Sequence, residues 1–178
     1  KGSLNHLLQT DNTFGKDRIR VLRMFREILQ GVRYMHSLGW IHADLKADNI
    51  VVDEHENAKL IDFDLSVRAN KQEYIRGTAE YMEPDLLLSK GLKLTFDQYM
   101  DVYALGVLLY EMVSMGRVPF TNVDRQAFPQ QVKEGNYKFY AGIDVEIAYL
   151  VHNCIKFDRN TRFSIDQLID HTDAALAN

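Results

Sequence analysis

The chain has 178 residues, 46% of them hydrophobic, and a formal net charge of −4 at neutral pH. This length and composition suit one domain with a hydrophobic core of its own. The acidic balance, and the lack of a basic stretch that would neutralise phosphates, argue against binding of nucleic acid or of a membrane surface.

Cysteine usage and hydropathy bear on the compartment. Cys154 is the single cysteine, which rules out an internal disulfide framework, and we expect an intracellular, cytoplasmic protein. No apolar run approaches the ~20 residues of a transmembrane helix. No signal peptide is visible, and because the first residue is Lys1 rather than Met we expect the chain to be a fragment.

The first predicted element is a long amphipathic helix over residues 17–38. Its apolar stripe recurs at alternating steps of three and four residues, at Leu22, Phe25, Leu29, Val32 and His36. Gly39 follows as the stop signal.

Short β-rich runs come next, at residues 40–42, 50–52 and 59–61. The polar stretch 53–57 joins the second run to the third and predicts a β-hairpin. No periodicity holds from residue 65 to residue 84, which predicts a long loop, and loops of that length are usually functional.

The remaining elements are predicted helices. Residues 97–115 are apolar around most of the circumference and predict a buried central helix, with its apolar positions at Val102, Leu105, Leu108, Leu109 and Met112. Further helices are expected at 124–134, where Pro129 interrupts, and at 145–157. Ser164 and Gln167 form a capping-box pattern that opens the last helix. We therefore predict one mainly α domain with a few short β-strands near its start, an α+β arrangement over residues 1–178.

One short loop concentrates the chemistry. It places a carboxylate (Asp44), an ammonium (Lys46) and a carboxamide (Asn49) within six residues, and Asp62 follows after the hairpin. Each of these residues alone is more often structural, so the ordered set carries the argument. Asp44 suits the orientation of a hydroxyl and acceptance of its proton. Lys46 suits a phosphoryl group, and Asn49 with Asp62 offers the hard oxygen ligands that Mg²⁺ prefers.

This pattern resembles the catalytic loop H-R-D-x-K-x-x-N and the D-F-G motif of eukaryotic-type protein kinases. Residues 77–85 are similar to the end of the kinase activation segment, G-T-x-x-Y-M-A-P-E, and residues 101–112 to the family's central helix. The resemblance runs from about Gly2 to Ile169 and is to the helical C-terminal lobe only. The glycine-rich loop, the β-strand lysine and the helix-borne glutamate of the N-terminal lobe are not found.

The resemblance implies ATP and Mg²⁺ as cofactors and a protein as substrate. It assigns Asp44 to the substrate hydroxyl, Lys46 to the γ-phosphoryl group, and Asn49 with Asp62 to Mg²⁺. Lys46 and Thr78 together indicate a serine/threonine kinase, in which Thr78 helps to fix Asp44 and Lys46 beside the incoming hydroxyl.

The resemblance also implies a partner, the missing N-terminal lobe, which clamps adenine and the α- and β-phosphates. Leu108 and Met112, beside Val51, are implied as the floor beneath adenine, from which they continue into the core. We therefore expect the chain alone to be inactive and to associate through its exposed apolar surface.

Three supporting contacts are implied as well. Asp101 would brace the backbone of the catalytic loop. His42 would be a packed core histidine that supports Phe63 and Asp101. Arg162 would pair with Asp85, the acidic residue that follows the proline of the activation segment.

Two positions depart from the kinase pattern. Ala43 replaces the arginine that binds an activation-loop phosphate, and segment 67–77 holds Tyr74 but no Ser or Thr. We hypothesise that activity does not depend on activation-loop phosphorylation. Asp64 replaces a glycine that permits positive φ, so we expect a metal-binding segment biased towards one state. Its charge either helps to bind metal or repels Asp62.

Two other functions remain open. A pseudokinase or scaffold would bind partners without phosphotransfer, a hypothesis that Ala43, Asp64 and the missing lobe favour. A small-molecule kinase of the aminoglycoside- or choline-kinase sort shares H-x-D-x-x-x-x-N. Such enzymes lack the peptide-docking type of segment at residues 77–85, which argues against this alternative.

Overall fold

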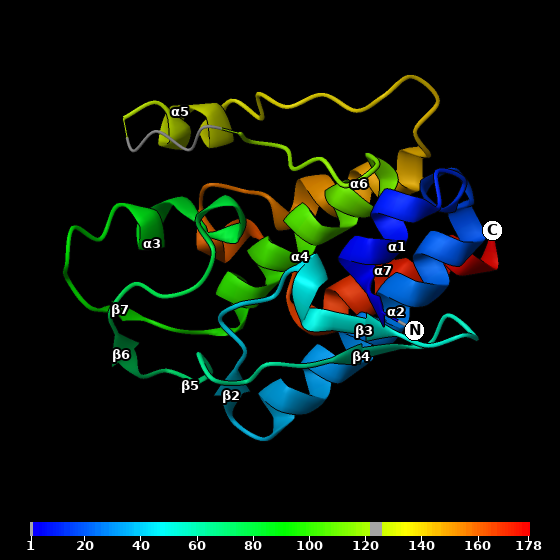
Figure 1. Ribbon diagram of the computed structural model, residues 1–178. Helices are drawn as coiled ribbons and strands as arrows, with labels where there is room; N and C mark the ends of the chain where they lie inside the picture. Colours follow the sequence, from blue (N-terminus) through cyan, green and yellow to red (C-terminus); the bar gives the residue numbers. More distant parts are fainter. Residues whose placement is uncertain (1, 122–125) are drawn as a thin grey trace.

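The computed structural model describes residues 2–121 and 126–178. The α-helices are α1 (Leu4–Thr10), α2 (Arg18–Ser37), α3 (Pro84–Leu87), α4 (Gln98–Val113), α5 (Phe128–Lys133), α6 (Val145–Cys154) and α7 (Ile165–Ala177). The 3₁₀ helices are η1 (Phe14–Lys16), η2 (Ala47–Asn49), η3 (Ala79–Tyr81) and η4 (Arg159–Thr161). The strands are β1 (Gly2–Ser3), β2 (Trp40–Ile41), β3 (Ile50–Val52), β4 (Ala58–Leu60), β5 (Val67–Arg68), β6 (Gln72–Glu73) and β7 (Leu94–Thr95). The fold is mainly α with a few short strands, as predicted (Figure 1).

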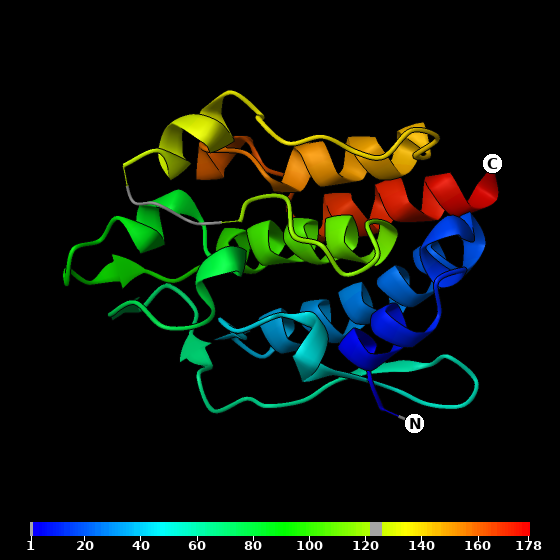
Figure 2. The ribbon, with the colours of Figure 1, turned by 45° about the horizontal axis from the view of Figure 1, so that its top comes forward.

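Helix α4 lies at the centre of the molecule. It packs against α6, α2 and α7, and Figure 2 shows it between α6 and α2. Every residue from Met100 to Val113 is buried, which confirms the central helix expected from its apolar sequence. A Cβ atom added at Gly106 would lie 2.4 Å from the Cβ of Cys154, so glycine permits the close approach of α6.

The predicted amphipathic helix is α2. Asp17 caps its first turn by accepting a hydrogen bond from Arg20 N, and the helix ends just before Gly39, which has φ 82°. Its buried stripe includes Leu22, Phe25, Leu29 and Val32. Both predicted ends are correct to within one residue.

The predicted hairpin is confirmed by the antiparallel pairing of β3 with β4, in which Val51 lies opposite Lys59. Strand β1 adds to the other edge of β3. The Asp53 carboxylate accepts the backbone N–H groups of His55 and Asn57 and closes the turn. Asn49 precedes β3 and Asp62 follows β4, so both lie at the open end of this hairpin.

Segment 65–84 is more ordered than its sequence suggested. It contains β5, which pairs with β2, and β6, which pairs with β7 (Figure 1). Two further backbone hydrogen bonds join it to Phe96, which follows β7, from Asn70 N to Phe96 O (2.8 Å) and from Phe96 N to Lys71 O (2.9 Å). The expectation of an irregular loop is therefore only partly correct, because two-residue strands are too short to show a periodicity.

The later helices differ from the prediction mainly at their ends. Pro129 lies in the first turn of α5, where a proline is tolerated, so it does not interrupt that helix; the predicted start, at residues 124 and 125, lies outside the described residues. Helix α6 ends at Cys154, three residues early. Helix α7 opens with the predicted capping box of Ser164 and Gln167. Among the described helices, none has the length and apolarity that a membrane crossing requires.

Candidate active site

Asp101, in the first turn of α4, fixes the backbone of the loop that carries Asp44. The buried carboxylate of Asp101 accepts hydrogen bonds from the backbone N–H of His42 (2.9 Å) and of Ala43 (3.0 Å). It also contacts Nε2 of His36 at 2.7 Å, which adds α2 to the same junction. The predicted bracing by Asp101 is confirmed, and the most buried helix of the fold thereby fixes the loop backbone.

A close backbone approach brings the activation-segment residues to this loop. Ala43 has φ 67°, and a Cβ atom added at Gly77 would lie 2.6 Å from the carbonyl oxygen of Ala43. Gly77 itself has φ 103°, a conformation that L side chains rarely adopt. Glycine at this position therefore lets Thr78 reach Asp44.

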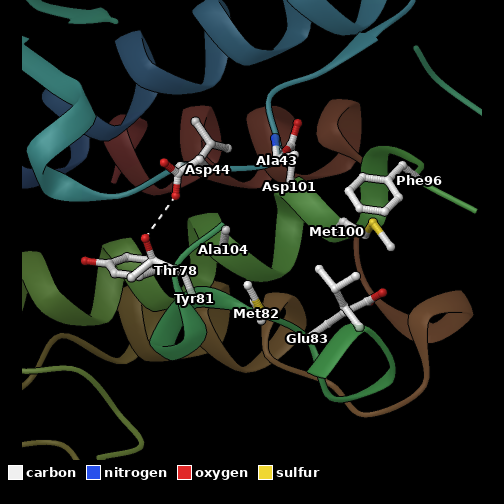
Figure 3. Close-up of a pocket in the computed structure, with 12 residues that line it drawn as sticks. Ala43, Asp44, Thr78, Tyr81, Met82, Glu83, Phe96, Met100, Asp101 and Ala104 are labelled. Carbon is white, nitrogen blue, oxygen red and sulfur yellow. Dashed lines mark hydrogen bonds between the residues drawn. The ribbon is translucent and has the colours of Figure 1, made fainter. Parts of the chain in front are cut away.

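The side chains of Asp44, Lys46 and Thr78 form one hydrogen-bonded chain. Thr78 Oγ1 donates to Asp44 Oδ1 at 3.0 Å, and Lys46 Nζ donates to Thr78 Oγ1 at 3.0 Å. Lys46 Nζ also lies 3.9 Å from Asp44 Oδ2, and the Asp44 side chain is only 10% exposed. Figure 3 shows Asp44 and Thr78 facing each other. The structure thus brings together the three residues that the sequence proposed as catalytic.

The small cavity drawn in Figure 3 lies between this loop, α4 and the segment from Thr78 to Leu86. Its volume is about 20 Å³, which is room for a water molecule and for little else. This region is therefore a packed junction beside Asp44 and is too small to be a ligand pocket.

Asn49 is tied to Asp44 as well. Its buried amide nitrogen donates to the Asp44 carbonyl oxygen (2.8 Å) and to Asp44 Oδ2 (3.1 Å). Because both amide hydrogens are used in this way, the Oδ1 atom is the part of Asn49 that is suited to bind a cation.

Asp62 lies beside Asn49 because Ile61 N donates to the Asn49 carbonyl oxygen at 2.9 Å. The Asp62 side chain is exposed, and its Oδ1 accepts a 3.4 Å hydrogen bond from Asp64 N. The left-handed backbone conformation falls on Asp62 (φ 60°) and not on Asp64. Asp64 therefore does not adopt the positive φ that a glycine at this position would permit, and the expected bias of the segment towards one state stays a prediction.

The oxygen atoms of Asn49 and Asp62 can be compared with the ligands that Mg²⁺ prefers. Within residues 2–121 and 126–178 there is no cluster of three or more His, Cys, Asp or Glu side chains able to hold a metal. The chain offers the Oδ1 of Asn49 and the carboxylate of Asp62. Two such oxygens fit Mg²⁺, which usually keeps water and substrate phosphates as its other ligands.

His42 is a core residue, as predicted. Its ring is buried and packs edge-on against Phe63, with centroids 5.6 Å apart. Nδ1 accepts the backbone N–H of Asp44 at 3.1 Å, and Nε2 lies 3.2 Å from the Ile61 carbonyl oxygen. Its ring therefore connects the catalytic loop to the segment that carries Asp62.

The residues expected to form the floor beneath adenine differ in exposure, and their contact with adenine stays a prediction. Val51, on β3, is 38% exposed, and Ile61 and Phe63 are also exposed apolar residues. Leu108 and Met112 are completely buried, because the helix that carries them is covered by other elements on all sides. Of the three proposed floor residues, Val51 alone reaches the surface.

The predicted pair of Arg162 with Asp85 is wrong. Arg162 donates to Glu83, whose carboxylate is fully buried, while Asp85 is exposed. Glu83 has an extended backbone just before α3, whereas Asp85 lies on the outer side of the first turn of that helix. Sequence analysis missed Glu83 and its second partner, Arg159. The available signal was an acidic residue where the kinase pattern has alanine.

A second buried acid was also missed. The hydroxyl of Tyr81 donates to the Glu111 carboxylate, which joins η3 to α4. Burial raises the pKa of Glu111 to about 7, and it raises the pKa of Tyr81 far above its usual range. The nearby charge of Asp48 acts in the same direction on both groups.

A mainly helical lobe, with an acid, a lysine and a threonine gathered on a loop that is braced by its central helix, defines a protein kinase C-terminal lobe. The sequence model for the protein kinase domain matches residues 1–172, and the chain belongs to the protein kinase family.

Its relatives include kinases from distant organisms. Sperm motility kinase Z of Mus musculus is 30% identical over 172 residues, which cover 94% of this chain and 33% of that protein. The probable serine/threonine-protein kinase fhkC of Dictyostelium discoideum is 30% identical, over 96% of this chain and 29% of that protein. A probable serine/threonine-protein kinase KIN1 homolog of Encephalitozoon cuniculi is 33% identical, over 83% and 26%. The chain spans about a third or less of the length of these relatives.

Proposed function

We propose that this chain is the C-terminal lobe of a serine/threonine protein kinase that transfers the γ-phosphoryl group of ATP to protein hydroxyls. The observation that carries the proposal is the hydrogen-bonded chain of Asp44, Thr78 and Lys46. It places a proton acceptor, Asp44, and a cation, Lys46, on either side of the Thr78 hydroxyl and 3.9 Å from each other.

Each of the three side chains has one task in this proposal. Asp44 orients the substrate hydroxyl and accepts its proton as the oxygen attacks phosphorus. Lys46 neutralises charge on the transferring phosphoryl group. Thr78 holds Asp44 and Lys46 in fixed positions relative to each other, and its contact with Lys46 supports specificity for serine and threonine.

The ATP side of the site consists of Asn49, Asp62 and Val51. Mg²⁺, when bound, would neutralise phosphate charge, and Asn49 Oδ1 with the Asp62 carboxylate would hold it. Val51 would contact adenine from the C-terminal lobe.

We further propose that this lobe works together with an N-terminal lobe of the full-length protein, and that the chain alone is incompetent. The exposed Val51, Ile61 and Phe63 support this, since they form apolar surface beside the proposed ATP site. The single cysteine, Cys154, is free and buried, which supports an intracellular site of action.

A pseudokinase or scaffold is the second candidate, and the exposed pair of Asp62 and Asp64 is the observation that favours it. Two adjacent carboxylates without a cation repel each other, which would weaken ATP binding. Against this candidate, the chain retains the carboxylates, the lysine and the amide that phosphotransfer needs.

Phosphotransfer by the full-length protein tests the proposal. We expect Mg²⁺-dependent ATP binding and transfer to a serine or threonine peptide. Asp44→Asn should abolish transfer while retaining ATP binding. Asp170→Asn, which changes an exposed carboxylate on α7, is the matched control and should leave both unchanged. ATP binding without any transfer would favour the pseudokinase.

A further inference from the structure

The end of segment 77–85 is anchored by a buried anion with two cationic partners. The Glu83 carboxylate is completely buried and accepts hydrogen bonds from both Arg159 and Arg162, one on each oxygen. Burial of a carboxylate is costly unless it is paired and hydrogen-bonded, and here each oxygen has its own arginine.

The two arginines differ in what else they hold. Arg162 is almost wholly buried, and its other N–H groups donate to backbone carbonyl oxygens of Lys156 and Tyr99. It therefore serves the packing between η4 and α4. Arg159 is also little exposed to solvent. Its remaining N–H groups do not donate within this packing but towards β7, the strand that pairs with segment 65–84.

Arg159 makes two contacts beyond Glu83. Its Nη1 donates to the carbonyl oxygen of Thr95 on β7 at 2.9 Å, and to Asp97 Oδ2 at 3.0 Å. Asp97 uses its other oxygen to cap α4 by accepting the Tyr99 N–H. Burial opposes the charged form of Arg159, but Glu83 and Asp97 outweigh it and raise the pKa of the guanidinium above its ordinary value.

Arg159 is connected to segment 65–84 in two ways, through β7 and through Glu83. Thr95 lies opposite Gln72 in the β6–β7 pair, so Arg159 holds the strand against which segment 65–84 is ordered. Glu83 lies five residues after Thr78, which contacts Asp44. Figure 3 shows Glu83 and Thr78 at opposite ends of the same junction.

We propose that Arg159 is a positioning residue: it fixes β7 and Glu83 to the start of α4, and thereby orders segment 72–83 without a phosphate. A guanidinium suits this task because its planar fork serves several acceptors at once, whereas a lysine ammonium does not. The inference rests on the proposed function, and it explains how the segment stays in place although Ala43 replaces the arginine that would bind a phosphate.

Hydrogen exchange on the full-length protein tests this proposal directly. Arg159→Gln should increase amide exchange about tenfold within residues 72–83 and 94–97, since it removes charge-assisted hydrogen bonds to both. Exchange in α2 and α7 should not change. Arg159→Lys should give an intermediate increase, because it keeps the charge but loses the fork. Arg26→Gln removes a bidentate pair with Asp173 between α2 and α7 and is the matched control.

Steady-state kinetics on the same variants separate positioning from general stability. Arg159→Gln should raise KM for the peptide substrate about tenfold. It should leave KM for ATP unchanged, because Asn49 and Asp62 are not held by Arg159 or Glu83. Because Thr78 lies in the ordered segment, kcat should fall as well. A KM for ATP that rises as much as the KM for the peptide would overturn the positioning role.

The exchange result stands apart from catalysis. Unchanged exchange at residues 72–83 in Arg159→Gln would overturn the inference whether or not the protein transfers phosphate. A localised increase supports it even in a protein without phosphotransfer, in which case the proposed function alone fails.

Discussion

Thr78 and Asp44 are separated by 34 positions in the sequence and joined by one hydrogen bond of 3.0 Å. The bond connects the activation segment to the catalytic loop, and Lys46 extends it at the same length. Both residues have further contacts that fix their positions. The amide of Asn49 donates to Asp44, and the close approach of Gly77 to Ala43 positions Thr78. The proposed catalytic group is therefore positioned before any substrate is bound.

Removal of this hydroxyl should impair turnover. We expect Thr78→Val in the full-length protein to lower kcat by about 10- to 100-fold, because Asp44 and Lys46 lose their common partner and small misplacements near the reacting atoms are costly. Thr10→Val is the control, since the Thr10 hydroxyl bonds only to its own helix, at His6 O. Equal activity of the two variants would argue against a role for Thr78.

Asp101 should be essential for the catalytic loop. In Asp101→Asn an amide N–H group replaces one acceptor and faces a backbone N–H of His42 or Ala43. We expect the free energy of unfolding to fall by about 2–3 kcal/mol, the cost of leaving a buried donor unsatisfied. Urea denaturation measures this, with the exposed Asp170→Asn as reference. A loss under 0.5 kcal/mol would contradict the bracing role.

Substitutions of Glu83 and of Asp85 should differ in their effect on the free energy of unfolding. Glu83→Gln should destabilise the protein by about 3 kcal/mol, because Arg162 becomes a buried charge without a full counter-charge. Asp85→Asn should change stability by less than about 0.5 kcal/mol, since Asp85 is an exposed carboxylate. Thermal or urea unfolding of both variants decides between them. The reverse ranking would restore the pairing of Arg162 with Asp85 that the kinase pattern implies.

Glu111 should make stability depend on pH. Its pKa of about 7 lies above the value of an exposed glutamate, so the folded state retains a proton that the unfolded state has lost. Wild-type stability should therefore fall as pH rises from about 4.5 to 7, by about 3 kcal/mol. Glu111→Gln should remove that fall, because glutamine does not titrate and its side-chain oxygen still accepts from Tyr81. Urea midpoints at several pH values test this. Parallel pH profiles for the two proteins would exclude Glu111 as the cause.

Activity should not depend on activation-loop phosphorylation. The segment is held by the β2–β5 and β6–β7 pairs, and Tyr74 is the one residue with a hydroxyl group between residues 67 and 77. Phosphatase treatment of the full-length protein, and the variant Tyr74→Phe, should each leave kcat within about twofold of the untreated value. Loss of activity on phosphatase treatment would sink the hypothesis.

The sequence alone determined the longer helices and the order of the candidate site residues along the chain. The stripe of α2, the apolar circumference of α4 and the capping box of Ser164 are local patterns, and local patterns report local structure. The spacing of Asp44, Lys46 and Asn49 also lies within one loop, so their order along the chain already implied that their side chains lie close together.

Only the tertiary structure decided which distant residues meet. It paired Arg162 with Glu83 instead of Asp85, brought Arg159 to the same carboxylate, and placed positive φ on Asp62 and not on Asp64. The physical reason is common to these cases. The direction in which a side chain points depends on backbone angles and on burial by elements remote in sequence, and no short sequence pattern encodes either.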